Sequence, residues 1–344
     1  MTHIAGRLQD ELGLAAFQLQ LEQSLRAWLD AAELRVDELW EDSRAVLVDF
    51  ALRPAKRVRP TLLATGYALA RGSVNAEALV DFGAGLELLH AFMLVHDDVA
   101  DRATTRRGGP ALHVALGGDR AAESKAIVAG DYLYARALEA MLATPGALPA
   151  TRYMLEVCRY TAAGQHLDLA LASRPLGEVA LRQAVRVAKL KTARYGFVAP
   201  LVCGAMLGGG SSDLVHRLSR VGERAGLAYQ LRDDVIGLFG DDAVAGKQGG
   251  ADFLEGKRTV PVLVAWQRAD AAGRERLERL WAAPSEGLLS EARAEVVHHG
   301  GLEATERLIT RATEAARVGL DGLPRSPGLP VLSGMLGALA ARAA

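Results

Sequence analysis

The sequence predicts an all-α fold, built as one domain over residues 1–344 with about ten or more helices. Apolar residues make up 50% of the chain and recur at helical spacing through most of its length. Patterns that alternate apolar and polar residues, which are typical of strands, are nearly absent. No low-complexity linker or fixed-period repeat divides the chain, so we expect one core larger than that of a four-helix bundle.

The principal helices follow from long segments that are rich in alanine and leucine and free of proline. In chain order they are Leu12–Leu34, Ala78–His96, Lys125–Met141, Arg152–Leu171 and Val221–Leu238. Proline and glycine separate them at Pro145, Pro149, Pro175, Gly208–Gly210 and Pro284. Near the end, Gly300 and Gly301 are predicted to stop a helix at His299, and Leu302–Leu320 to form the next helix.

Composition excludes several classes of protein. The formal net charge is −1, whereas nucleic-acid-binding proteins carry a basic footprint. Cys158 and Cys203 are too few for a disulfide framework or a four-cysteine zinc site. The most apolar run, around Val198–Gly210, is shorter than the ~20 residues that cross a bilayer, and no secretory signal is visible. We therefore expect a soluble, cytoplasmic protein with no nucleic-acid partner and no membrane span.

The strongest chemical signal is the acidic motif Asp97-Asp98-Val99-Ala100-Asp101, at the end of the helix that begins near Ala78. Asp97 and Asp101 are four residues apart, so their carboxylates share one helix face. Like charges there repel each other unless a cation lies between them. A solvated helix terminus is the alternative interpretation, and the apolar turns before the motif argue against it.

A second acidic pair, Asp233-Asp234, is predicted to end another long apolar helix. Two acidic helix ends that face each other would form an oxygen-rich site suited to Mg²⁺, which binds carboxylates, water and phosphates. Two such motifs on apolar helices are stronger evidence than one. The sequence therefore predicts a metal site built from both motifs.

Basic residues accompany both motifs, and four of the six lysines fall among them. The segments are Lys56-Arg57-Val58-Arg59-Pro60, Arg106-Arg107-Gly108, Lys191-Thr192, Gly246-Lys247 and Glu255-Gly256-Lys257. Acids and bases together indicate a ligand that is itself polyanionic, such as a diphosphate. Divalent metals would bridge it to the aspartates, while arginine and lysine would meet its outer oxygens.

Taken together, these motifs resemble those of the trans-isoprenyl diphosphate synthases, the polyprenyl synthetase family that includes farnesyl and geranylgeranyl diphosphate synthases. The resemblance runs from about Lys56 to Pro261. It also rests on Gly164-Gln165-x-x-Asp168 and on Gln230-x-x-Asp233-Asp234, which follow the others in the family's order. It implies a helical bundle around a deep central cavity, of the class I isoprenoid synthase type, and a homodimer.

The resemblance implies a Mg²⁺-dependent prenyltransferase. Such an enzyme ionises an allylic diphosphate (dimethylallyl, geranyl or farnesyl), adds isopentenyl diphosphate head to tail and eliminates a proton, which gives a short all-trans prenyl diphosphate. Three Mg²⁺ ions are implied, with Asp97, Asp101 and Asp233 as ligands and Asp98 and Asp234 as supporting residues.

The residues that bind the substrates are implied in the same way. Together with the metals, the allylic diphosphate would be held by Arg106, Lys191, Lys247 and Lys257. The diphosphate of isopentenyl diphosphate would be held without a metal by Lys56, Arg59, His90 and Arg107. Lys191, Thr192 and Gln230 would act at the reacting carbon, where the dipoles of Thr192 and Gln230 would stabilise the developing cation.

Two positions depart from the family's pattern. The second motif usually ends in a third aspartate, and here that position is Gly237. If Asp233 is the main ligand, activity survives this change; if it is not, the third metal would be held weakly. The usual Gly-Gly before Lys-Arg-x-Arg is replaced by Pro54-Ala55, which would stiffen that loop.

Bulky residues just before the first acidic motif imply a short product in this family. Phe92 and Met93 lie five and four residues before Asp97, about 6–8 Å along the helix axis. We therefore expect a C20 (geranylgeranyl) product ahead of a C15 (farnesyl) product. An ordinary place for Phe92 in the core is the alternative interpretation.

Two other functions share parts of the pattern. A class I terpene cyclase carries an Asn/Asp–Ser/Thr–Glu triad at i, i+4 and i+8, where this chain has Asp233, Gly237 and Asp241. A cyclase also has no use for a second diphosphate site. A non-catalytic partner subunit of a prenyl synthase is favoured only by Gly237.

Overall fold

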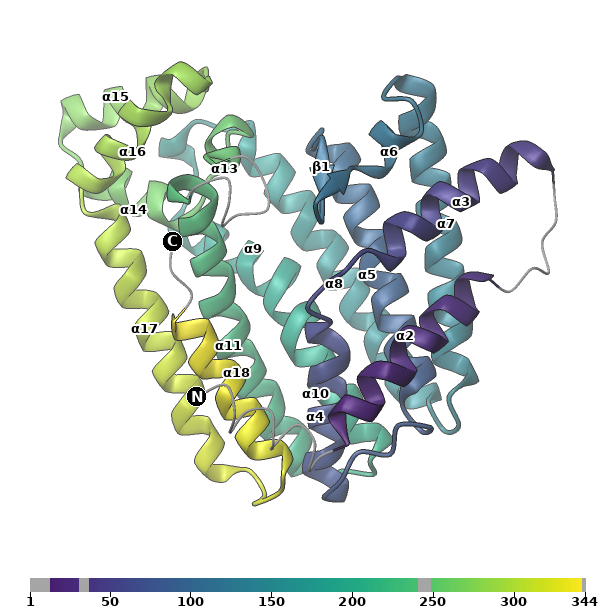
Figure 1. The fold of residues 1–344 in the computed structure, drawn as a ribbon. Helices are drawn as coiled ribbons and strands as arrows, with labels where there is room; N and C mark the ends of the chain where they lie inside the picture. The colour runs from purple at the N-terminus through teal and green to yellow at the C-terminus, as the bar shows by residue number, and fades with distance from the viewer. Residues whose placement is uncertain (1–12, 31–36, 241–248, 342–344) are drawn as a thin grey trace. The chain divides into compact units, whose positions relative to one another are not determined.

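The computed structural model describes residues 13–30, 37–240 and 249–341 (Figure 1). It confirms the all-α prediction, because the described residues contain well over ten helices and their strands are confined to one two-stranded hairpin. The residues group into two compact units. The first consists of the chain up to Tyr153 with residues 200–211 and 324–331, and the second of the remainder. The single domain over residues 1–344 stays a prediction.

The first unit contains most of the N-terminal half of the chain. Its elements are α2 (Leu14–Asp30), α3 (Glu38–Leu52), α4 (Val58–Arg71), α5 (Val80–Ala100), β1 (Thr105–Arg106), β2 (Gly109–Pro110), α6 (Leu112–Ala115) and α7 (Arg120–Ala143). It also includes the first residues of α8 (Leu148–Ala172) and of α18 (Gly328–Ala341), and nearly all of α10 (Ala199–Leu207).

The second unit contains the rest of α8 and α18 and the elements between them. These are the 3₁₀ helix η1 (Leu176–Glu178), α9 (Leu181–Val187), the π-helix η2 (Ala188–Val198), α11 (Ser212–Phe239), α13 (Ala251–Leu254), α14 (Val260–Arg268), α15 (Ala271–Ala282), η3 (Glu286–Leu288), α16 (Leu289–His298), α17 (Gly301–Gly319) and η4 (Leu320–Gly322). As predicted, a helix ends at the histidine pair and another begins directly after Gly300, whose φ of 68° is left-handed.

The predicted helix Val221–Leu238 agrees with the end of α11, but the prediction that the second acidic pair ends its helix is wrong. Asp233-Asp234 does not end its helix, because α11 continues to Phe239. Val235, Ile236 and Leu238, which follow the acidic pair, are all buried. Their apolar side chains keep the helix packed against the core of the second unit, so the chain has no reason to turn at the aspartates.

The core of the first unit is built around α5, which packs against α7 and α2. Eight consecutive residues of α5, from Phe82 to Leu89, are buried, as expected for a helix that is apolar on most faces. Elsewhere in this unit α4 and α10 cross backbone to backbone. A Cβ atom on Gly66 would lie 2.1 Å from the carbonyl oxygen of Leu201, and one on Gly204 would lie 1.9 Å from that of Leu63. Only glycine fits at both positions.

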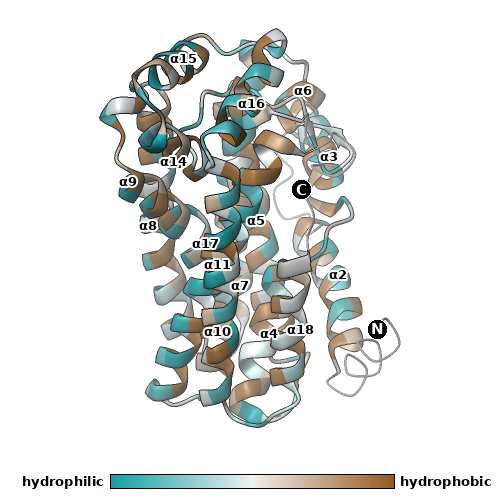
Figure 2. Ribbon diagram, turned by 90° about the vertical axis from the view of Figure 1, so that its left-hand side faces the viewer, coloured by the Kyte–Doolittle hydropathy of each residue, from teal (hydrophilic) through white to brown (hydrophobic). Residues whose placement is uncertain are grey.

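The core of the second unit lies beside α11, which packs against η2 and α17. Leu231, Val235 and Leu238 of α11 join a cluster that includes Phe253 and Trp281. Figure 2 shows hydrophilic and hydrophobic bands alternating along α17, as expected for a helix with one buried face. This packing holds α11 rigidly, and with it the second acidic motif.

No helix in the described residues combines the length and the apolar character needed to span a bilayer.

Candidate active site

The first acidic motif lies on the last turn of α5. The helix ends at Ala100, and the backbone N–H of Asp101 caps it by donating to the carbonyl of Asp97, 2.8 Å away. Asp97 and Asp101 are half-buried, whereas Asp98 is fully buried. The spacing therefore places Asp97 and Asp101 on one face of the helix, as predicted.

Asp98 holds Arg106 rather than facing solvent. The Nε of Arg106 donates to Oδ1 of Asp98 at 2.8 Å, and Nη2 of the same guanidinium also donates to that carboxylate. Burial alone would lower the pKa of Arg106, but the hydrogen bond and the charge of Asp98 raise it. Arg106 is thus a permanent cation fixed beside the acidic motif.

A tight hairpin positions Arg106 and Arg107. Thr105 pairs with Pro110, and Arg106 with Gly109. The two turn residues have left-handed backbones, with φ of 52° at Arg107 and 73° at Gly108, as a type I′ turn requires. Arg53 braces the hairpin by donating to the carbonyls of Arg106 and Pro110, at 3.1 and 2.7 Å.

Three of the four residues predicted to hold the second diphosphate act on one another electrostatically, and the positive charge there belongs to Arg59 and Arg107. Burial lowers the pKa of His90 well below its usual value of 6.5, and the charges of Arg59 and Arg107 lower it further. Burial also lowers the pKa of Arg107. Its Nη1 atom is buried and makes no hydrogen bond within the described residues. Lys56, the fourth residue, is exposed.

Arg57 has a structural role that the sequence pattern did not reveal. It lies between Lys56 and Arg59, yet its side chain is only 6% exposed. Its Nη1 donates to Glu87 at 2.7 Å and its Nε to Glu22 at 2.8 Å. This buried pair ties the start of α4 to α5 and α2, and so fixes the segment that carries Arg59.

A pH titration tests the environment of His90. Because its pKa is depressed in the folded protein, its NMR signal should titrate with a midpoint well below pH 6.5. The unfolded chain binds that proton more readily, so this residue makes the protein lose stability as the pH falls below about 6.5. Arg107→Met removes one repelling charge and should raise the midpoint. A midpoint near the ordinary value of 6.5 would contradict the burial of His90 beside Arg59 and Arg107.

In the second unit, η2 and α11 bring together three predicted residues. The hydroxyl of Thr192 donates to Oε1 of Gln230, and Nε2 of Gln230 donates to Oδ1 of Asp234 at 2.7 Å. The π-helical turn of η2 sets the direction of Thr192, and π-helical segments are frequent at functional sites. This chain of hydrogen bonds fixes the orientation of both polar side chains.

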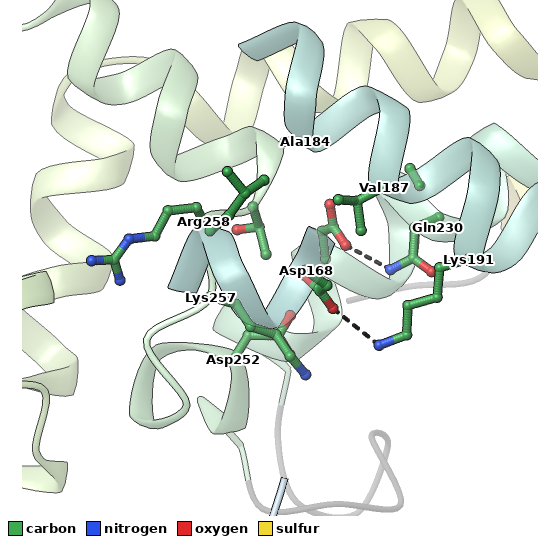
Figure 3. Close-up of a pocket in the computed structure, with 12 residues that line it drawn as sticks. Asp168, Ala184, Val187, Lys191, Gln230, Asp252, Lys257 and Arg258 are labelled. Carbon is green, nitrogen blue, oxygen red and sulfur yellow. Dashed lines mark hydrogen bonds and ion pairs between the residues drawn. The ribbon is translucent and has the colours of Figure 1, made fainter. Parts of the chain in front are cut away.

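Lys191 is fixed by Asp168, as Figure 3 shows. Its Nζ lies 3.0 Å from Oδ2 of Asp168 on α8. The two helices approach closely, since a Cβ atom on Gly164 would lie 2.8 Å from the backbone nitrogen of Lys191. The motif Gly164-Gln165-x-x-Asp168 therefore has two physical purposes, close approach at the glycine and pairing at the aspartate.

Asp168, Lys191, Gln230 and Asp234 line one pocket of the second unit, with a cavity volume of about 60 Å³. Its charged and polar lining residues are Asp168, Lys191, Gln230, Asp234, Asp252, Lys257, Arg258 and Thr259 (Figure 3). Lys257 contacts the carboxylates of Asp252, at 3.4 Å, and Glu255. Asp233 is half-buried on α11. Lys247 lies outside the described residues.

The buried acids of this pocket repel one another. Burial raises the pKa of Asp234 to about 8, the charge of Asp252 raises it further, and the hydrogen bond from Gln230 opposes both. Such a site favours a bound cation, which would relieve the repulsion.

The carboxylates of each acidic motif, taken separately, suit a hard divalent cation that takes some of its ligands from a substrate. Asp97, Asp101 and Asp233 offer carboxylate oxygens, the donors that Mg²⁺ prefers. In the described part of the chain, no three acids, histidines or cysteines converge closely enough to hold a metal alone. Mg²⁺ usually binds to one or two carboxylates together with water and phosphate, so these residues suit a metal that arrives with a diphosphate.

Sequence reasoning missed two acids of the pocket. Asp168 belongs to a motif that it recognised, but it received no role. Asp252 gave no signal at all, because its importance comes from its position beside α11 rather than from any spacing along the chain.

Comparison with known proteins decides the family. A family model described as polyprenyl synthetase matches residues 44–296. The chain is a polyprenyl synthetase. It is therefore a prenyl transferase of isoprenoid biosynthesis, and its homologues establish a prenyl diphosphate synthase of the short-chain class.

This polyprenyl synthetase is 32% identical over 281 residues to the short chain isoprenyl diphosphate synthase of Methanothermobacter thermautotrophicus, covering 81% of this chain and 83% of that protein. It is 33% identical over 288 residues to a geranylgeranyl diphosphate synthase of Mycobacterium tuberculosis, covering 82% and 79%. Relatives of similar identity are named geranylfarnesyl and octaprenyl diphosphate synthases, so the comparisons leave the product length open.

Among solved structures, the polyprenyl synthetase is similar to the geranylgeranyl pyrophosphate synthase of Corynebacterium glutamicum, solved with isoprenyl diphosphate and magnesium. The two share 30% sequence identity and a TM-score of 0.86, over 95% of this chain and 99% of that one. The all-α fold is thus that of the polyprenyl synthases.

Proposed function

We propose that this enzyme condenses isopentenyl diphosphate with an allylic diphosphate and makes a C20 prenyl diphosphate in preference to C15. One observation carries the proposal: Lys191, Gln230 and Asp234 line a single pocket, Thr192 is hydrogen-bonded to Gln230, and all four side chains are held by hydrogen bonds or ion pairs. A lysine, a hydroxyl and an amide held in this way suit a reaction that separates a carbocation from a diphosphate.

Lys191 is the proposed contact for the departing diphosphate. Its ammonium group now faces Asp168, and an arriving diphosphate would compete for it or share it. The hydroxyl of Thr192 donates a hydrogen bond to Gln230, which leaves its oxygen lone pairs for the positive carbon that develops when the C–O bond breaks. Asp234 holds the amide of Gln230 so that its oxygen stays directed at Thr192.

Divalent metal belongs to this proposal, with Asp97, Asp101 and Asp233 as carboxylate ligands and three ions as the expected number. Bound Mg²⁺ would supply positive charge to the leaving diphosphate. Support comes from the donor set and from the structural relative solved with magnesium. The chain's own contribution is to fix Arg106 beside the first motif through Asp98.

The positive cluster in the first unit is the proposed site for the second diphosphate. Arg59, His90 and Arg107 act on one another electrostatically, and the buried Nη1 of Arg107 has no hydrogen-bond partner within the described residues. Buried positive charge of this kind favours an anionic group. A terpene cyclase needs no second diphosphate, so this cluster favours the synthase over the cyclase.

The C20 preference rests on an aromatic contact before the first motif. The ring of Phe92 lies 5.2 Å from that of Tyr134 on α7 and 4.6 Å from that of His96. Phe92 and Met93 are half-buried rather than sealed in the core. Phe92 supported by Tyr134 would form the floor against which a growing prenyl tail stops.

Removing the floor should lengthen the product. We expect Phe92→Ala, and to a smaller degree Tyr134→Ala, to shift the main product by at least one C5 step, because each deletes a ring from the proposed floor. Chromatography of the dephosphorylated products measures the shift. Leu138→Ala, a half-buried position on the next turn of α7 from Tyr134, serves as the matched control. If Phe92→Ala leaves the product unchanged, Phe92 packs as an ordinary core residue and does not limit the product length.

The proposed function is tested by incubating purified protein with Mg²⁺, isopentenyl diphosphate and each of the C5, C10 and C15 allylic diphosphates. Condensation with a predominantly C20 product supports the proposal, whereas no condensation with any of them overturns it. The homodimer implied by the family resemblance and the cytoplasmic location expected from the sequence remain part of the proposal. Sedimentation of the purified protein tests the first and fractionation of the source cells the second.

A further inference from the structure

Position 237 is where the second acidic motif lacks its third aspartate. Gly237 follows Asp233 by one turn of α11, so a side chain there would share a face with Asp233, with Cβ atoms about 5–6 Å apart. In the first motif, Asp97 and Asp101 form such a pair on α5. The second motif supplies only one carboxylate to the equivalent face of its helix.

A carboxylate from elsewhere in the chain occupies the space beside Gly237. A Cβ atom built on Gly237 would lie 2.2 Å from Oδ2 of Asp252, 2.5 Å from its Cγ and 3.0 Å from its Oδ1. A methyl group at position 237 would require the carboxyl group of Asp252 to move away from α11. Glycine lets Asp252 stay against α11 in the position described.

The surroundings of Asp252 match those of a residue that works in the pocket. Asp252 is on the short helix α13 and lines the pocket with Lys191, Gln230 and Asp234 (Figure 3). Its Oδ1 lies 3.4 Å from Nζ of Lys257, and its Oδ2 is the oxygen nearest to Gly237. One oxygen thus contacts a proposed diphosphate-binding lysine while the other lies over the face of α11 that carries Asp233.

We propose that Asp252 supplies, through space, the carboxylate that the second acidic motif lacks at position 237, and that it supports the divalent cation held by Asp233. The inference rests on the proposed function, which brings the metal and the diphosphate together in this pocket. It explains how the motif works with glycine at its last position: α11 offers no side chain there, and the carboxylate comes from α13.

The test is to move the carboxylate between the two helices. Asp252→Asn keeps the shape and removes the charge, and should weaken Mg²⁺ binding in the presence of inorganic diphosphate by about 10- to 100-fold, the loss typical of residues that support metal ligands. Asp252→Gly should weaken it equally. The double variant Gly237→Asp/Asp252→Gly returns the carboxylate to α11 and should recover most of the affinity. Isothermal titration calorimetry measures all of these affinities without turnover.

Glu255→Gln is the matched control, because Glu255 is another carboxylate that contacts Lys257. It should bind Mg²⁺ with the same affinity as the unchanged protein. The comparison separates loss of the Asp252 carboxylate from loss of an ion pair that holds Lys257. Circular dichroism checks that each variant is folded. If the double variant fails to fold, Asp252→Asn against Glu255→Gln decides the matter, since equal affinities overturn the inference.

The inference and the proposed function fail in different ways. Unchanged protein that binds Mg²⁺ with diphosphate and condenses isopentenyl diphosphate upholds the proposed function. If Asp252→Asn then binds Mg²⁺ as tightly, the role of Asp252 is overturned while the function stands. Recovery of affinity by the double variant supports the role of Asp252.

Discussion

Asp97→Ala is expected to lower kcat for condensation by roughly 10³-fold, which corresponds to about 4 kcal/mol of lost transition-state stabilisation. The variant removes one of the two half-buried carboxylates on the last turn of α5 and leaves Arg106 and Asp98 as they are. Asp233→Ala on α11 should lower kcat by a similar factor. Steady-state rates at saturating Mg²⁺ and substrate measure both effects.

Glu77→Ala is the control for these variants, since Glu77 is an exposed acid of the same unit as Asp97 and has no proposed role. Its rate should equal that of the unchanged protein. Thermal unfolding should show that Asp97→Ala is as stable as the control. A near-full rate for Asp97→Ala would contradict its assignment as a metal ligand.

Arg57→Met is expected to reduce the free energy of unfolding by about 3–5 kcal/mol, the cost of leaving one partner of a buried ion pair uncompensated. Glu87 is buried and receives its hydrogen bond from Nη1 of Arg57. Arg107 is the other nearby cation, at 4.0 Å. Such a loss is a large share of the stability of a typical domain. Denaturant titration measures it.

The double variant Arg57→Met/Glu87→Leu is the matched control. Replacing both partners with apolar side chains of similar volume should recover much of the lost stability, because no buried charge then remains unpaired. A surface ion pair typically contributes about 1 kcal/mol or less. If Arg57→Met lowers the free energy of unfolding by no more than that, the ion pair with Glu87 does not hold the start of α4 in place.

The fold class and the two acidic motifs could be predicted because they depend on local pattern. Helical periodicity over long proline-free segments predicts helices whatever they pack against. The aspartates were recognisable because each pair follows apolar turns. The mistaken end of α11 shows the limit of that argument, since Val235 and Ile236 continue the buried stripe beyond the acids.

The remaining features depend on contacts between distant segments. The π-helical turn that carries Thr192 depends on close approach at Gly164 and Gly226, which no period along the chain shows. Burial of Arg57 between two more accessible bases depends on Glu22 and Glu87 from other helices.

The central claim is that the protein alone joins two substrates and releases one diphosphate for each isopentenyl diphosphate consumed. Adding one C5 unit forms a carbon–carbon bond, breaks the allylic C–O bond and removes one proton, so the two quantities should rise together. The direct measurement is a parallel count, with Mg²⁺ and each of dimethylallyl, geranyl and farnesyl diphosphate, of isopentenyl diphosphate consumed and inorganic diphosphate released. We predict a ratio of one to one and no release without isopentenyl diphosphate. Diphosphate release without its consumption would indicate a cyclase, and no release at all a non-catalytic subunit; either result would contradict the synthase assignment.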